Sequence, residues 1–348
     1  MFDTQLIKQL SDMSGVSGYE NNVGEFVKSL FSKYCDEVTG DNMGNVIAIK
    51  KSKAQNPYKL MIEAHMDEIG LMVTNIDDNG FLNFTTVGGI DARILLANEV
   101  TVHGKKDIFG IIGAKPPHVL TADERTKTVP VDKLYIDIGY DKKTAMELVS
   151  PGDVVTFKNK FLELKNGIVS TKSQDDRTSV AILYSVMKKL CNVDCPYDLY
   201  FVASVQEEVG LRGAKTAAYG INPDMAIVID VCHASTPDSG CDGVYDFGSG
   251  AIITKGPNIN PKLLKRVLTA LDNNGIGYEI DIEGGDTGTD AWAVQVSRCS
   301  IPTVLFSVPL RYMHTPVETV STEDLSVIVN SICAFCSETE NTEGFLCY

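Results

Sequence analysis

Three short motifs decide the fold of this chain: Ala64-His65-Met66-Asp67-Glu68, Gln206-Glu207-Glu208-Val209-Gly210 and Ile229-Asp230. Each motif stands at the end of an apolar run, over residues 59–63, 199–205 and 226–229 respectively. Short apolar runs of this kind are typical of strands that are buried on both faces, as in a parallel sheet. The sequence therefore predicts an α/β fold around parallel strands.

The positions of the polar motifs predict a functional edge of that sheet. In open α/β sheets, ligands bind in the crevice at the carboxyl ends of the strands. Three distant segments would therefore bring His, Asp and Glu side chains to the same edge. Burying several acids together is costly unless a cation neutralises their charge. The pattern indicates a metal site.

The pattern between residues 69 and 167 differs from that of the flanking regions. Short strand-like runs alternate there with Gly, Pro and Asp turns, which indicates a small inserted β-barrel or sandwich. On both sides of this stretch, helical and strand patterns alternate, with helices predicted at residues 20–34, 177–190, 261–273 and 322–336. The expected organisation is a discontinuous α/β domain of residues 1–68 and 168–348, interrupted by a β-rich domain of residues 69–167.

Composition limits the partners and the cellular compartment. The 348 residues carry a formal net charge of −15, which argues against binding to nucleic acid or to an anionic membrane. No apolar run approaches the ~20 residues that span a bilayer, and the first ten residues lack the pattern of a signal peptide. The nine cysteines form no compact framework and are typical of reduced thiols. A cytoplasmic protein is predicted.

The inventory of candidate ligands fits a site with two metals. Of the five histidines, His65 follows a strand directly and His314 lies after the run of residues 303–308. Asp230 and Glu208 follow strands, whereas Asp175 precedes a helix and is equally suited to cap it. One His and one carboxylate per metal, with a third carboxylate between them, is typical of two-metal hydrolases. Spacing alone leaves a second interpretation open: scattered acids at strand ends and histidines with structural partners.

Four longer stretches carry a resemblance that decides between these interpretations. They are His65-Met66-Asp67-Glu68-Ile69-Gly70, Asp175-Asp176-Arg177, Val205-Gln206-Glu207-Glu208-Val209-Gly210-Leu211-Arg212-Gly213-Ala214 and Pro309-Leu310-Arg311-Tyr312-Met313-His314-Thr315-Pro316-Val317-Glu318. In order and over essentially the whole chain, they resemble the tetrahedral (TET) di-metal aminopeptidases. This family includes glutamyl aminopeptidases and proteins labelled FrvX-like or cellulase M. The resemblance implies a three-layer α/β/α domain with an inserted β-barrel that serves in dimerisation.

The resemblance also implies a role for each site residue. It makes His65, Asp175 and Asp230 the ligands of one metal, and Asp175, Glu208 and His314 those of the second, with Asp175 between the two. Asp176 is the alternative for the shared position. The resemblance makes Glu207 the general base and Asp67 the carboxylate that orients His65.

The expected cofactors and partners follow from the same resemblance. Two divalent ions per subunit are expected, zinc or cobalt before manganese, since nitrogen and oxygen ligands accept all three. The expected substrates are short peptides, from which N-terminal residues are released. Self-association from dimers to a dodecamer is expected, and the apolar stretch of residues 109–117 is a candidate contact.

Several other residues have a structural interpretation that is simpler than a functional one. His103 and His118 fall in the insertion, and His233 is expected to be a loop histidine that could line the pocket. The glycine-rich loop of residues 284–290 lacks the lysine of a P-loop, so we interpret it as a wall of the substrate pocket. Trp292 is expected to serve in the packing of a helix.

Two functions from other classes compete with the aminopeptidase. An endo-1,4-β-glucanase agrees with the cellulase label, but glycosidases need a free pair of carboxyl groups, and here almost every acid has a predicted metal role. A non-catalytic binding protein would be expected to lack a ligand or the base. All six residues of the predicted ligand and base set are present in the sequence.

Overall fold

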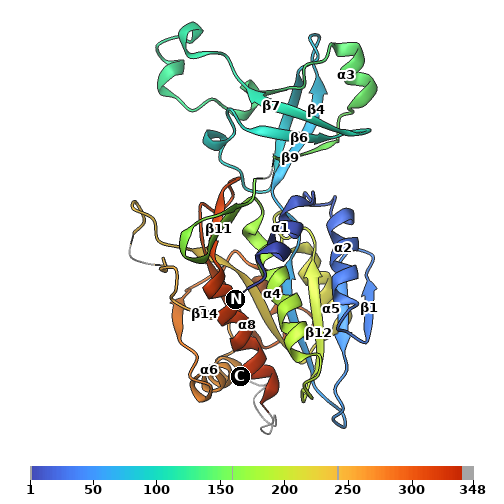
Figure 1. The fold of residues 1–348 in the computed structure, drawn as a ribbon, viewed down its shortest axis with the longest axis vertical. Helices are drawn as coiled ribbons and strands as arrows, with labels where there is room; N and C mark the ends of the chain where they lie inside the picture. Colours follow the sequence, from blue (N-terminus) through green and yellow to red (C-terminus); the bar gives the residue numbers. More distant parts are fainter. Residues whose placement is uncertain (1, 159, 241–242, 339–348) are drawn as a thin grey trace.

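Buried apolar side chains form two separate clusters in the computed structural model, which describes residues 2–158, 160–240 and 243–338. The larger cluster lies around an eleven-stranded sheet, and the smaller one fills a closed six-stranded barrel. The barrel stands at one end of the long axis, above the α/β part (Figure 1). The predicted fold class, an α/β protein with an inserted barrel, is confirmed.

Four parallel strands form the centre of the large sheet, in the order β12-β3-β13-β16. Nearly all their residues are buried, because helices cover both faces and exclude water from the apolar runs. The three motifs that end these runs therefore share one edge, as predicted. The bounds are β3 (Lys59–His65), β12 (Asp198–Ser204), β13 (Met225–His233) and β16 (Thr303–Arg311).

Antiparallel strands extend this centre on both sides. Beyond β12 come β2 (Val46–Lys50) and β1 (Glu37–Gly40). Beyond β16 come β17 (Glu318–Ser321), β11 (Ile168–Thr171) and β10 (Leu162–Glu163). A side branch also leaves β16: it pairs antiparallel with β14 (Ala251–Lys255), which pairs in parallel with β15 (Tyr278–Ile282).

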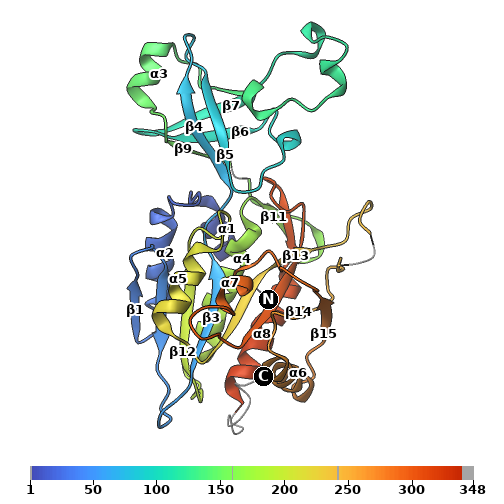
Figure 2. The same ribbon diagram turned by 180° about the vertical axis from the view of Figure 1, so that it is seen from behind.

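Helices cover the two faces of the sheet unequally. One face carries α1, α2, α4 and α8 (Figure 1), and the other carries α5 and α7 (Figure 2). The helix α6 packs on α8 and β16. The helices of this part are α1 (Thr4–Asp12), α2 (Asn21–Phe31), α4 (Gln174–Leu190), α5 (Arg212–Ile221), α6 (Pro261–Asn273), α7 (Asp290–Val294) and α8 (Thr322–Ser337).

The barrel closes in the order β4-β5-β8-β7-β6-β9, so none of its strands leaves an unpaired edge. Its strands are β4 (Gly70–Ile76), β5 (Leu82–Val87), β6 (Glu99–His103), β7 (Asp107–Gly113), β8 (Tyr135–Asp137) and β9 (Val154–Phe157). It also carries α3 (Lys142–Leu148) and the 3₁₀ turns η1 (Ala92–Ile94), η2 (Pro117–Val119), η3 (Glu124–Thr126) and η4 (Val131–Lys133); η5 (Lys165–Gly167) precedes β11.

The barrel interrupts the chain between β3 and β11. Its strands run from Gly70 to Phe157, inside the predicted insertion of residues 69–167. The strand β10 falls in the same range of sequence but pairs with β11 of the large sheet. The domain boundaries at residues 69 and 167 stay a prediction. No helix in the described part of the chain is long and apolar enough to cross a membrane.

Candidate active site

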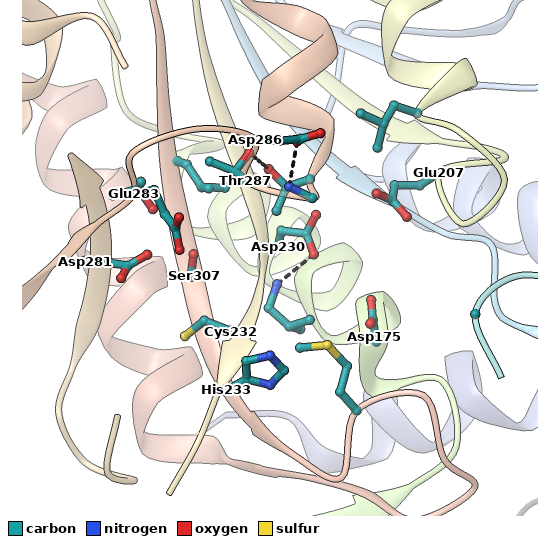
Figure 3. Close-up of a pocket in the computed structure, with 18 of the residues that line it drawn as sticks. Asp175, Glu207, Asp230, Cys232, His233, Asp281, Glu283, Asp286, Thr287 and Ser307 are labelled. Atoms are coloured by element: carbon teal, nitrogen blue, oxygen red, sulfur yellow. Dashed lines mark hydrogen bonds between the residues drawn. The ribbon is translucent and has the colours of Figure 1, made fainter. Parts of the chain in front are cut away.

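A pocket of about 710 Å³ opens at the carboxyl ends of the parallel strands. Its volume lies in the range of small-molecule sites. The motif residues Glu207 and Glu208 line it after β12, and Asp230 lines it from β13. Figure 3 shows Asp230 between two groups of acidic side chains, with Asp175 and Glu207 on one side. The pocket therefore lies where the sequence places the functional edge.

Two groups of side chains in this pocket have the composition and spacing of metal sites. In the first group, His65, Asp175 and Asp230 each offer one ligand atom, and these atoms lie within 4.8 Å of one another. Asp175, Glu208 and His314 form the second group under the same limit. Asp175 Oδ1 lies 3.0 Å from His65 Nε2, and Asp175 Oδ2 lies 3.4 Å from His314 Nε2. One carboxylate thus faces both histidines.

Asp176, the alternative for the shared position, belongs to neither group among the described residues. It follows Asp175 through a cis peptide bond and is fully buried. Its two carboxylate oxygens have no hydrogen-bond partner in the described structure. Burial raises the pKa of Asp176 well above its ordinary value, and the nearby Asp230 adds to the effect.

Asp67 links the first histidine to the Glu207-Glu208 pair. Its Oδ1 lies 3.3 Å from His65 Nδ1 and accepts the backbone N–H of Glu207 at 3.0 Å. Its Oδ2 accepts the N–H of Glu208 at 3.2 Å and the hydroxyl of Ser17 at 2.6 Å. Asp67 is fully buried, and it stands between the His65 ring and the turn that carries both glutamates.

Glu207 faces the pocket without joining either ligand group in the described structure. Its Oε2 lies 3.9 Å from His65 Nε2. Its neighbour Glu208 points to His314 instead, with Oε2 at 3.4 Å from Nε2. The two adjacent glutamates thus serve different parts of the pocket, because successive side chains at a strand end point in different directions.

Left-handed backbone conformations occur beside three of these residues. Ser173 has φ 53°, Gln206 has φ 58° and His314 itself has φ 58°. Such values are uncommon for residues other than glycine and cost free energy unless the surroundings fix them. Ser173 lies two residues before Asp175, Gln206 lies directly before Glu207, and His314 is itself a candidate ligand, so the local backbone is shaped for the site.

Glu318 connects two of the loops that carry candidate ligands. Its Oε1 accepts the backbone N–H of His314 at 2.8 Å, and its Oε2 accepts that of Asp175 at 3.1 Å. The side chain is buried. Sequence reasoning assigned Glu318 no role, although its position four residues after His314 in the same motif was a usable signal.

A buried ion-pair network holds the N-terminal segment against the site. Glu68 Oε1 accepts the backbone N–H of Gly15 at 3.0 Å and lies 3.3 Å from Arg177 Nη2. Glu68 Oε2 accepts from Lys172 Nζ at 2.5 Å. Arg177 also donates from Nε to the carbonyl oxygen of Met66 at 2.7 Å. The network fixes the segments on both sides of Asp67 and Asp175.

A second buried acidic pair lies behind His65. Glu63 on β3 and Asp290 at the start of α7 are both fully buried, and Ser204 Oγ donates to Asp290 Oδ2 at 2.9 Å. Burial raises the pKa of Glu63 well above its ordinary value, and Asp290 adds to this shift. The sequence signal was the one acidic residue in a strand made mostly of apolar residues, but nothing local in the sequence identified Asp290 as its neighbour.

The barrel also reaches the pocket, through the loop after β5. Gly88 has φ +79°, and a Cβ atom there would lie 2.8 Å from Ile69 Cγ2 and 3.3 Å from Glu208 Oε2. A Cβ atom on Gly89 would lie 3.0 Å from His314 Nδ1. The loop approaches so closely only because both residues lack side chains.

The pKa values show that the pocket holds more acid than it can ionise alone. Burial raises the pKa of Glu207 to about 10, that of Glu208 to about 8 and that of Asp230 to about 7, and neighbouring carboxylates add to each shift. The hydrogen bond to Asp175 raises the pKa of His314 to about 9. Burial opposes ionisation of Asp175 too, but hydrogen bonds from both histidines lower its pKa.

The residues present fit divalent cations. Asp230 Oδ2 is buried and has no hydrogen-bond donor among the described residues. A metal ion satisfies such an oxygen and neutralises neighbouring carboxylates, and His with Asp or Glu is a ligand set that zinc, cobalt and manganese accept.

The remaining residues singled out in the sequence lie in different environments. His103 is in the barrel, where Nδ1 lies 2.8 Å from Asp107 Oδ1. His233 is exposed and lines the pocket, and so does part of the loop of residues 284–290. Trp292 in α7 is 37% exposed, and in the described structure it is not part of the pocket lining.

Comparison with known proteins identifies the chain as a peptidase, in agreement with its fold and its pocket. The sequence model of the M42 glutamyl aminopeptidase family matches residues 44–330. The lysyl aminopeptidase of Pyrococcus furiosus is 33% identical over 97% of this chain and 98% of its own length. The chain therefore belongs to the M42 glutamyl aminopeptidase family. The predicted resemblance is confirmed, and the aminopeptidase class with it.

Solved structures support the same assignment. An aminopeptidase from Desulfurococcus kamchatkensis superposes with a TM-score of 0.89 at 35% identity, covering 96% of this chain and 94% of that one. The TET1 peptidase of Pyrococcus horikoshii, described as assembling into a tetrahedron or a large octahedral shell, gives 0.85 at 35% identity, with 96% and 99% covered. A Thermotoga maritima structure that is named an endoglucanase also matches, with a TM-score of 0.77 at 30% identity and coverage of 95% and 96%.

Proposed function

We propose that the chain is a two-metal aminopeptidase that releases N-terminal residues from short peptides, with Glu207 as the general base. The observation that carries this proposal is the position of Asp175, whose carboxylate belongs to both candidate ligand groups. A carboxylate shared by two His- and acid-containing groups is the arrangement expected of a co-catalytic pair. His65 and Asp230 would complete one site, and Glu208 and His314 the other.

The chain's own residues have distinct tasks in this proposal. Two divalent cations, zinc or cobalt and alternatively manganese, would supply activation of a water molecule and polarisation of the scissile carbonyl. Glu207 takes the proton from the attacking water and returns it to the leaving amine. Asp67 holds the His65 ring and the backbone of Glu207, so the base and the ligand keep a fixed relation.

The test is an activity assay on metal-depleted protein. After prolonged dialysis against a chelator, we expect no hydrolysis of aminoacyl nitroanilides, and we expect zinc or cobalt to restore it. Carboxymethylcellulose serves as the competing substrate, because an endoglucanase would hydrolyse it. Full peptidase activity in excess chelator would contradict the two-metal mechanism, and hydrolysis of cellulose alone would contradict the peptidase function.

We also propose that the chain self-associates through its barrel, from dimers up to a dodecamer. Phe109 and Ile111 alternate with buried residues along β7, and they are 49% and 46% exposed. Exposed apolar side chains on a strand are typical of a contact surface. Light scattering of the metal-loaded protein tests the assembly, and a fully active monomer at micromolar concentration would contradict it. The cytoplasmic location stays a prediction.

A further inference from the structure

The pocket has a second set of carboxylates that the metal ligands do not include. Asp281 lies on β15, and Glu283 follows two residues later, so both side chains point to the same face. In Figure 3 they lie beside Ser307, across Asp230 from Asp175 and Glu207. We call Asp281 and Glu283 the acidic wall.

The side branch of the sheet builds this wall rigidly. Thr254 on β14 pairs with Asp281 on β15 in the parallel register, so the two side chains are neighbours. The hydroxyl of Tyr245 donates to Asp281 Oδ1 at 2.7 Å. Thr254 lines the pocket and is fully buried, yet its hydroxyl oxygen has no hydrogen-bond partner in the described structure. A buried hydroxyl without a partner is costly unless a ligand satisfies it.

The charge of the acidic wall is not balanced within the pocket. Among the described lining residues there is no lysine or arginine. Two divalent cations would match the charge of the three ligand carboxylates and of Glu207, which leaves none for the wall.

The pocket lining also includes apolar side chains on which an aliphatic chain can pack. Cys232 follows Asp230 by two residues on β13 and lines the pocket, as does the buried Leu305 on β16. A lysine side chain has this character: a methylene stem that packs on apolar surface and a charged end that needs polar partners.

We propose that the acidic wall receives the side chain of the substrate's N-terminal residue and that this residue is lysine or arginine. The inference rests on the proposed aminopeptidase function and adds its substrate class. The cationic end donates hydrogen bonds to the carboxylates of Asp281 and Glu283 and to the Thr254 hydroxyl, which accepts. The stem packs on Cys232 and Leu305, and the scissile bond faces Glu207.

The test compares aminoacyl-coumarin substrates of lysine, arginine, norleucine and glutamate on the zinc- or cobalt-loaded protein. Norleucine is the matched control, because it keeps the stem of lysine and lacks its charge. We expect kcat/KM for lysine and arginine to exceed that for norleucine by ~10-fold or more, as one charge-assisted hydrogen bond provides. The excess should shrink with rising ionic strength.

Variants locate the preference on the wall. In Glu283→Gln and in Asp281→Asn, which keeps an acceptor for Tyr245, we expect the lysine-to-norleucine ratio of kcat/KM to fall by ~10-fold. Glu279→Gln is the matched control, since Glu279 lies on the same strand and face but outside the described pocket lining. Its ratio should stay within about twofold of the parent, as expected for an exposed charge. Because each ratio is measured within one variant, partial loss of folded protein does not affect it.

The outcomes separate this inference from the function on which it rests. If no aminoacyl substrate is hydrolysed with any metal, the proposed function fails. If norleucine or glutamate is hydrolysed as well as lysine, only the inference about the wall is overturned. It is also overturned if Glu283→Gln loses a metal ion that the parent protein binds, because the wall would then be a cation site.

Discussion

The two sides of the pocket both carry acidic residues, but they differ in how those residues are held. On the metal side, Asp175 faces His65 and His314, and Asp67 secures the turn of the two glutamates. On the other side, Asp281 is held by the single hydroxyl of Tyr245, and the half-buried Glu283 faces the pocket. The carboxylates crowded on the metal side need a resident cation to neutralise them, whereas the two carboxylates of the acidic wall would bind a cation that enters with the substrate.

The strands that carry the two sides of the pocket explain this difference. The metal side is built where three parallel strands end together, which concentrates polar groups from distant segments. The other side belongs to β14 and β15, a branch attached through β16. The pocket therefore combines a fixed centre with a wall that can vary separately from it.

The largest effect that distinguishes the two sides is expected from Glu207→Gln. This change removes the proposed base and no candidate ligand, so we expect kcat to fall by ~10²–10⁴-fold while two metal ions remain bound. Turnover of a lysyl substrate and metal content by elemental analysis are the measurements.

His314→Ala is the matched comparison on the same side of the pocket. It deletes a candidate ligand and leaves the base, so metal occupancy should fall, and excess metal should restore part of the activity. The assignment of roles would be reversed if Glu207→Gln lost a metal and His314→Ala kept both.

A smaller effect, on metal affinity, is expected from Asp67→Asn. This variant tests whether the contacts of Asp67 fix the residues of the metal side. The amide removes the charge that faces His65 Nδ1, and we expect metal affinity to fall by ~10–100-fold. Metal titration followed by calorimetry measures it. Ser17→Ala removes only the hydroxyl that donates to Asp67, so its effect should be smaller than that of Asp67→Asn, and an equal or larger effect would contradict the central role of Asp67.

The smallest effect is a dependence of metal-free stability on pH. The carboxyl groups of Asp230, Glu208 and Glu207 have pKa values of about 7, 8 and 10 in the folded chain. Between about pH 5 and 8 the folded protein thus binds more protons than the unfolded chain, and stability falls as pH rises. The raised pKa of His314, about 9, acts in the same direction above its ordinary value. The lowered pKa of Asp175 acts only in stronger acid.

Thermal unfolding in chelator at about pH 5.5 and pH 8 measures this dependence. We expect the lower pH to give the higher Tm, by about 5 °C. Added zinc should weaken or invert the trend, because metal binding requires deprotonated ligands. A chelated protein that became more stable with rising pH would show that the metal side does not carry excess acid.

The sequence predicted the elements of the site that depend on local pattern. Apolar runs identified the parallel strands, and the motif resemblance identified His65, Asp175, Glu208, Asp230 and His314, which the structure brings together in two groups. Their roles stay predictions. The helix predicted for residues 261–273 has the same bounds as α6.

The parts that were not predicted depend on contacts between distant segments. Nothing in the sequence of β15 showed that this strand would place Asp281 opposite the metal side. Glu318 and the pair of Glu63 with Asp290 were missed for the same reason. A buried acid is visible in a sequence, but the group that accompanies it is set by sheet order and register.

Gly88 and Gly89 closely approach Glu208 and His314, so the barrel cannot be separated from the α/β part without changing the pocket. Because the barrel has its own hydrophobic core, it resembles an independent domain that could be deleted or exchanged between relatives. Yet the loop after β5 forms part of the pocket wall, so a chain shortened to its α/β part would keep every candidate ligand and lose the surface that confines His314. Grafting a different barrel onto this chain would therefore require the two glycines and their spacing from β5 to be transferred with it.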